Sequence, residues 1–284
     1  MSLTLVTPRS RRAFAIAVTS GKGGVGKTSV AIHLAAALAG LRRRVALVDA
    51  DFALGNIDVR LGLTPERHLG AVLEGECDVE DVIVKGPLGL DVVPAASGIR
   101  ELSSLELGQW RRLSSALAAL ADDRDFIVID TATGVADAVL DVVALADYAL
   151  VVTTDDPASL VDAYATIKLL TDARRHQPIG VLANGVKDGD AAERVTRQLT
   201  RAARTFLDRT VRNDGYILAD ASLREASVRH AIATDVVAAS AAGRCFRRLA
   251  ARLAAASSTP PGAGPTPGLV APRLPAFVEA PRCA

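Results

Sequence analysis

The chain has 284 residues, half of them hydrophobic, and a formal net charge of +1. This length suits one large α/β domain or two small ones, and the near-neutral charge gives no electrostatic basis for general nucleic-acid binding. The three cysteines lack the spacing of a disulfide framework or a metal site, and we find neither a signal-peptide pattern nor an apolar run of about 18 residues. We therefore expect a cytoplasmic protein.

The first predicted strand, Phe14–Thr19, runs into a glycine-rich stretch that opens a helical pattern. This stretch has Gly21, four further residues and then Gly26-Lys27-Thr28, which is the P-loop pattern in its strand-to-helix context. Its glycines leave backbone N–H groups open to a polyphosphate, and the helix N-terminus faces the same anion. The pattern predicts that Lys27 reaches the β- and γ-phosphates and that the Thr28 hydroxyl ligates Mg²⁺.

Two carboxylates follow the second predicted strand, Val45–Asp49. Asp49 and Asp51 lie at its carboxyl end, and in an open α/β sheet ligands collect beyond the carboxyl ends of the strands. Beside a P-loop, such acids have Mg²⁺ and its water as partners. The next segment, residues 61–84, is acidic from Glu74 to Asp81 and is predicted to form short helical fragments on a solvated surface that is open to partner contacts.

The run Phe126–Asp130 has the Walker B pattern, in which four hydrophobic residues end in a carboxylate. A strand over Leu88–Pro94 and a helix over Leu102–Ala121 are predicted before it. The pattern places Asp130 at a strand tip, aimed through water at the magnesium of a bound nucleotide. Such a run is common by itself, but in a chain that also has a P-loop it is a specific signal of a nucleotide site.

Strands and helices continue to alternate in the rest of the chain. Strands are predicted over Tyr148–Thr154 and Ile179–Ala183. Helices are predicted over Leu160–Leu170 and Ala233–Ala256, the last of which closes the domain. This alternation predicts a single α/β P-loop NTPase domain over residues 13–256, with a mostly parallel sheet and helices on both faces. Residues 1–12 are predicted to be a flexible N-terminus, and residues 257–284, with seven of the thirteen prolines, a disordered tail.

A second lysine distinguishes the loop from most P-loops. The sequence Lys22-Gly-Gly-Val-Gly-Lys27-Thr28 resembles the deviant Walker A motif of the MinD/ParA ATPases. The resemblance implies that Lys22 reaches across an ATP-sandwiched dimer to the partner's nucleotide; a solvated lysine at the loop mouth is the alternative. It also implies that Asp51 orients the attacking water, that Asp49 supports the magnesium shell, and that the loop over residues 131–134 senses the γ-phosphate.

The predicted site therefore has three sets of residues. The catalytic residues are Lys22 and Asp51, and the magnesium set is Thr28, Asp49 and Asp130. The predicted nucleotide contacts are Gly21, Lys22, Gly23, Gly24, Val25, Gly26, Lys27, Thr28, Ser29, Asn184 and Asp220. The last two rest on the resemblance, which implies that Asn184 reads the purine edge and that Asp220 belongs to a loop beside the base, where Leu218 replaces the family's proline.

The segment Thr154–Lys168 has the order T-x-x-P-x-S-x-x-D-A-Y-A-x-I-K, which resembles the FlhG (FleN/YlxH) branch of the family, the regulators of flagellar number and placement. The resemblance implies an ATPase that uses ATP and Mg²⁺, forms an ATP-dependent homodimer, hydrolyses ATP slowly and binds flagellar assembly or positioning factors. Peripheral attachment at the inner membrane or a cell pole is also implied. However, relatives carry a membrane-targeting helix where this chain is proline-rich, which counts against membrane binding.

Two alternatives stay open. One is a MinD/ParA-type ATPase that positions the division site or a cargo. The other, from a different class, is a nucleotide-binding scaffold that does not hydrolyse ATP. The presence of Lys22, Asp51 and Asp130 counts against the scaffold.

Overall fold

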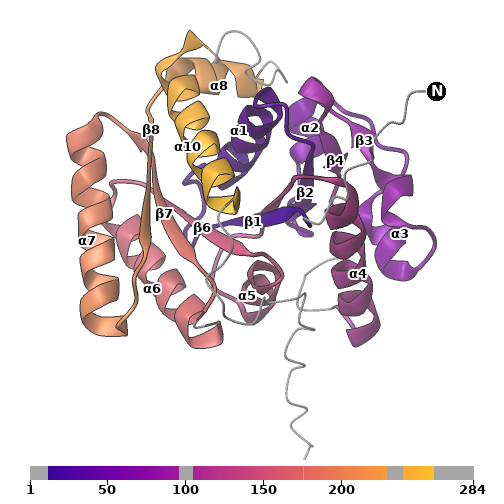
Figure 1. The fold of residues 1–284 in the computed structure, drawn as a ribbon, viewed down its shortest axis with the longest axis horizontal. Coiled ribbons are helices and arrows are strands. Elements are labelled where there is room, and N and C mark those ends of the chain that lie inside the picture. Colours follow the sequence, from indigo (N-terminus) through magenta and orange to yellow (C-terminus); the bar gives the residue numbers. More distant parts are fainter. Residues whose placement is uncertain (1–11, 96–104, 175, 229–238, 259–284) are drawn as a thin grey trace, which may run out of the picture.

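The computed structural model describes residues 12–95, 105–174, 176–228 and 239–258. Figure 1 shows a central sheet with helices on both of its faces. The strands lie in the order β3-β4-β2-β5-β1-β6-β7-β8, and β3 and β4 form its antiparallel pair, whereas the other neighbours are parallel. The predicted fold class, a mostly parallel α/β domain, is confirmed. None of the described helices is both long and apolar enough to cross a membrane.

The strands are β1 (Phe14–Thr19), β2 (Val45–Ala50), β3 (Val84–Lys85), β4 (Asp91–Val93), β5 (Phe126–Thr131), β6 (Tyr148–Thr153), β7 (Ile179–Val186) and β8 (Arg212–Leu218). The described α-helices are α1 (Lys27–Gly40), α2 (Ile57–Leu61), α3 (Leu69–Glu74), α4 (Leu107–Asp123), α5 (Asp137–Ala144), α6 (Pro157–Ala173), α7 (Gly189–Leu207), α8 (Ala221–Val228) and α10 (Ala241–Ser258). Two short 3-10 helices, η1 (Val79–Val82) and η2 (Pro87–Gly89), precede β4.

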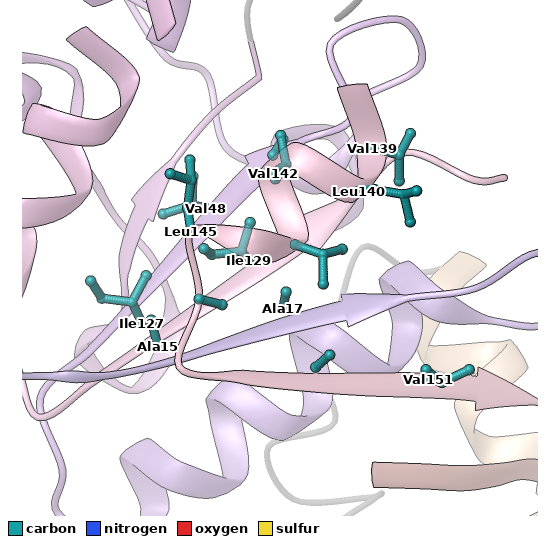
Figure 2. Close-up of a cluster of buried hydrophobic side chains, with 14 of the residues drawn as sticks. Ala15, Ala17, Val48, Ile127, Ile129, Val139, Leu140, Val142, Leu145 and Val151 are labelled. Carbon is teal, nitrogen blue, oxygen red and sulfur yellow. The ribbon is translucent and has the colours of Figure 1, made fainter. Parts of the chain in front are cut away.

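The central strands are apolar throughout because helices cover both of their faces. Side chains alternate along β1, so that Ala15 and Ala17 join the cluster under α3, α4, α5, α6 and α7, while Ile16 and Val18 join the cluster under α1 and α10. Figure 2 shows part of the first cluster, in which Val142 of α5 lies near Ile129 of β5. The sheet is therefore fixed from both sides, which holds its carboxyl ends in one place.

Two predicted elements are shorter than expected. The strand predicted over Leu88–Pro94 is reduced to Asp91–Val93 because Leu88 has a φ of 57°, in the left-handed region, inside η2. The helix predicted from Leu102 begins at Leu107, after the capping residue Glu106. The beginning of that prediction falls on residues 96–104, outside the described residues.

Other elements differ in kind or were not predicted. Leu218, predicted to be in a loop beside the base, belongs to β8, and α5 and α7 were not predicted at all. The closing helix α10 reaches Ser258, two residues past the predicted domain end. Its predicted start falls on residues 229–238, and the predicted tail and N-terminus fall mostly on residues 259–284 and 1–11, all outside the described residues.

A buried polar contact joins β6 to β8 across β7. Tyr148 donates a hydrogen bond to Asp214, and both residues are at most 2% exposed. The two side chains meet over Gly180 of β7, where a Cβ atom would lie 1.9 Å from Asp214 Oδ2 and 2.2 Å from the Tyr148 hydroxyl. Glycine is therefore required at position 180 for this contact to form.

We predict that Gly180→Ala breaks the Tyr148–Asp214 hydrogen bond and lowers the free energy of unfolding by about 2–4 kcal/mol, because it leaves a buried carboxyl without its donor. Differential scanning calorimetry would show this as a lower melting temperature. Gly40→Ala is the matched control, since a Cβ there meets nothing within 4 Å, and its melting temperature should not fall. A Gly180→Ala protein as stable as the parent would contradict this account.

Candidate nucleotide site

The predicted site residues come together at the carboxyl ends of β1, β2 and β5. The register between β1 and β5 places Val18 opposite Asp130, and the register between β2 and β5 places Asp49 opposite the same residue. Parallel strands bring their carboxyl ends to one edge. The P-loop after β1, the acids after β2 and the Walker B carboxylate of β5 therefore share a single site.

The glycines of the P-loop are required by backbone conformation and by packing. Gly24 and Gly26 have φ values of 80° and 88°, which L-side chains rarely adopt. A Cβ on Gly21 would lie 2.5 Å from the carbonyl oxygen of Asp162 in α6, and one on Gly26 would lie 2.4 Å from Asn184 Nδ2. The loop is thus pressed against α6 and β7 at two glycines.

Three contacts join the loop to distant parts of the chain. The Gly134 N–H donates to the Ser20 carbonyl at 3.0 Å, and Asn184 Nδ2 donates to the Val25 carbonyl at 2.7 Å. Lys22 Nζ lies 2.5 Å from a carboxylate oxygen of Asp156, the N-cap residue of α6. The loop shape is therefore set by β5, β7 and α6 as well as by its own glycines.

Lys27 forms a buried ion pair at the centre of the site. Its Nζ lies 3.0 Å from Asp130 Oδ1 and also donates to the Thr131 carbonyl, and the side chains of Lys27 and Asp130 are 5% and 1% exposed. In this structure the lysine charge is thus matched by Asp130. Phosphate oxygens of a bound nucleotide would compete with Asp130 for the same ammonium group. Phosphate binding is the role that the P-loop pattern predicts for Lys27.

Asp49 and Asp130 are neighbouring carboxyl groups with raised pKa values. Burial and the charge of Asp130 raise the pKa of Asp49 to about 7, although it accepts hydrogen bonds from the backbone N–H groups of Ile57 and Asp51, each at 3.1 Å. Burial also raises the pKa of Asp130, against the opposing effects of Lys27 and a hydrogen bond from Thr28. Two adjacent buried acids favour the approach of a further cation.

The side chains present fit Mg²⁺. Thr28 already lies within hydrogen-bond reach of Asp130, and Asp49 is next to it in the sheet. No group of three or more His, Cys, Asp or Glu side chains converges among the described residues. Such a group is not needed where Mg²⁺ takes most of its ligands from phosphates and water, and only one or two from protein.

Asp51 lies at the rim of the site and is half-buried. Its Oδ1 accepts a hydrogen bond from the Leu54 N–H at 3.1 Å, which orients the carboxylate. Gly55 brings the following loop close to Asp49, because a Cβ on Gly55 would lie 2.9 Å from Asp49 Oδ2. The loop after β2 therefore places Asp51 near the buried acids and leaves it accessible to water.

The two residues predicted to contact the base have other partners in this structure. Asn184 lies within β7 instead of at its end, and its amide supports the P-loop. The Asp220 carboxylate accepts hydrogen bonds from Ser222 and from the Ala242 N–H, which lower the pKa of Asp220 to about 2. Asp220 thus links the end of β8 to α10, and the base contacts of both residues stay predictions.

Sequence reasoning missed the role of Asp156. This residue accepts a hydrogen bond from the Ser159 N–H at 3.0 Å as the N-cap of α6, besides pairing with Lys22. The sequence Asp156-Pro-Ala-Ser159 is a recognisable helix start, so a capping analysis could have located it. Its approach to Lys22 joins residues 134 positions apart and has no local signal.

Residues 16–232 match the family model of the CobQ/CobB/MinD/ParA nucleotide binding domain. The chain belongs to this family. It is 42% identical over 238 residues to the antiactivator FleN of Pseudomonas aeruginosa, a match that covers 84% of this chain and 85% of that protein. It is 34% identical over 183 residues to the flagellum site-determining protein YlxH of Helicobacter pylori, covering 62% of this chain and 60% of that one.

A solved structure supports the same assignment. The cell division ATPase MinD of Pyrococcus furiosus aligns with a TM-score of 0.71 and 27% identity, covering 85% of this chain and 98% of that chain. Together with the P-loop and Walker B geometry, these matches confirm the prediction of an ATPase of the MinD/ParA type, similar to the FlhG (FleN/YlxH) flagellar regulators.

We predict that Lys27→Ala lowers the affinity for ATP by about 100-fold or more, because it removes a buried cation from the phosphate site. The fold should be retained, because Lys27 belongs to neither of the hydrophobic clusters that fix the two faces of the sheet. Isothermal titration calorimetry measures the affinity, and circular dichroism checks the fold. Lys168→Ala, which removes an exposed lysine of α6, is the control. Unchanged ATP affinity in Lys27→Ala would rule out the P-loop assignment.

Proposed function

We propose that this chain is an ATP-dependent dimerisation switch that hydrolyses ATP slowly and regulates flagellar number or placement. The observation that carries the proposal is the 42% identity to FleN over 84% of the chain. The site supports it, because both lysines of the P-loop, the acid at the rim and the Walker B acid lie at one edge of the sheet.

We assign the following roles to the residues of the site. Backbone N–H groups of the P-loop and the Lys27 ammonium bind the phosphates, and Asp51 orients the attacking water at the rim. Thr28 and Asp130 would hold Mg²⁺, with Asp49 in support, and the bound ion would supply charge stabilisation at the phosphates. Phosphoryl transfer depends mainly on positioning and charge, and this arrangement supports the proposal because it would supply both.

Lys22 is suited to act on a second copy of the chain. The Lys22 and Asp156 side chains are 39% and 48% exposed, and such an exposed ion pair contributes little to stability. Lys22 can therefore leave Asp156 at little cost and reach a nucleotide that approaches from outside. We propose that the ATP-dependent dimer provides this nucleotide.

Apolar side chains on the segments beside the site support a dimer at this face. Leu54, three residues after Asp51, is 77% exposed, and Val135, next to Gly134, is 37% exposed. Val161 in the first turns of α6 is 68% exposed. A dimer that closes over the site would cover these three side chains and remove their apolar surface from water.

We predict opposite effects for two substitutions. Asp51→Ala should bind ATP, hydrolyse very little of it and accumulate as a dimer, because the water is misplaced while the phosphate contacts remain. Lys22→Ala should bind ATP and stay a monomer, and its hydrolysis should fall by about 10³-fold or more, because a cation supplied in trans is lost. Sedimentation velocity with ATP distinguishes the two states. The double variant should stay a monomer, because dimerisation precedes hydrolysis.

Normal dimerisation and hydrolysis in Lys22→Ala would show that Lys22 is a solvated neighbour of the site. A generic P-loop ATPase would then remain. A parent protein that binds ATP but releases no phosphate above background would instead favour the non-hydrolysing scaffold.

The cellular role can be tested by deleting the chain in its own host. We expect an altered number or position of flagella in electron micrographs, restored by the parent chain and not by Lys27→Ala, because the switch needs ATP. Normal flagella together with misplaced division sites or cargo would favour the MinD/ParA-type positioning alternative.

A further inference from the structure

A line of arginines follows the outer face of α7. Arg194, Arg197, Arg201 and Arg204 are three, four and three residues apart, so that all four lie on one side of the helix. All four are exposed, and they extend over about 15 Å of helix axis. Figure 1 places α7 at the outer edge of the molecule, beyond α6 and β8. We call these four residues the arginine stripe.

The stripe is not needed for α7 to fold. The opposite side of the helix carries the packing residues, among them Val195, Leu199 and Ala203, which are at most 3% exposed. Arg197 pairs with Glu193 one turn earlier. The side chains of the other three arginines form no hydrogen bond or ion pair with any residue that the structure describes. Like charges at this spacing destabilise a helix, so the stripe costs stability unless an anionic partner neutralises it.

We propose that the arginine stripe binds an acidic, helical segment of a partner protein. Carboxylates that are three, four and three residues apart on a second helix repeat the axial spacing of the arginines, so the two helices can lie side by side with their charges matched. Guanidinium groups suit carboxylates because they can donate two parallel hydrogen bonds. The Arg197–Glu193 pair shows a single guanidinium–carboxylate contact within α7 itself.

The charges around the stripe favour a protein partner over nucleic acid. Asp190 and Asp208 lie at the two ends of α7, and Glu193 lies beside the stripe. A continuous phosphate backbone would be repelled at these points, whereas the acidic part of a helical segment can be short enough to fit between them. The formal net charge of +1 also provides no long-range attraction for a polyanion.

The stripe is a second surface, separate from the nucleotide site. It lies on the solvent side of α7, and the nucleotide site lies at the carboxyl ends of β1, β2 and β5. The proposal therefore does not depend on the proposed dimerisation switch. It assigns this chain a docking surface for an acidic helix.

The test measures binding of three probes to the full chain by fluorescence anisotropy. The first is a synthetic helical peptide with glutamates at positions i, i+3, i+7 and i+10, the second is a peptide of the same composition in scrambled order, and the third is duplex DNA of random sequence. The patterned peptide should bind more tightly than the scrambled one, and added salt should weaken it. The double variant Arg201→Glu, Arg204→Glu should lose about tenfold or more in affinity.

The double variant Arg42→Glu, Arg43→Glu is the matched control, because it makes the same change in net charge at exposed arginines after α1. It should bind the patterned peptide like the parent. Three results would overturn the proposal: equal binding of the two peptides, unchanged binding in the Arg201/Arg204 variant, or no binding of either peptide. Tighter binding of DNA than of the patterned peptide, lost in the same variant, would assign the stripe to nucleic acid instead.

Discussion

The ion pair between Lys27 and Asp130 is the contact on which the nucleotide site depends. Asp130 is buried beside Asp49, and without a cation the two acids would repel each other in a region that water scarcely reaches. Lys27 provides that cation from the first turn of α1. The same ammonium group is the one expected to meet phosphate, so a bound nucleotide and Asp130 share one positive charge.

The sheet makes this arrangement possible. Helices on both faces fix the strands, and parallel pairing brings the ends of β1, β2 and β5 to one edge. The P-loop is then held by contacts from β7 and α6, through Asn184 and through the packing of Gly21 against the Asp162 carbonyl. Because these contacts come from the second half of the chain, the loop reaches its shape only in the folded domain. The site is therefore a property of the whole fold.

The parts that could be predicted from sequence are those with a local signal. Buried strands such as Phe14–Thr19 appear in the sequence as continuous apolar runs, and the spacing of Gly21, Gly26 and Lys27 identifies the P-loop. Contacts between distant residues leave no such mark: Asn184 meets Val25 across 159 positions. The left-handed conformation of Leu88 was also unforeseen, because it occurs at a residue that does not favour it. The roles of the individual site residues stay predictions.

The most direct measurement is a crystal structure of the Asp51→Ala protein with ATP and Mg²⁺. We predict that Lys27 Nζ has left the Thr131 carbonyl for a β- or γ-phosphate oxygen, and that Lys22 has left Asp156 and contacts the nucleotide of a second copy. A structure with ATP bound in which Lys27 still contacts only Asp130 and Thr131, and Lys22 still pairs with Asp156 in a monomer, would contradict it.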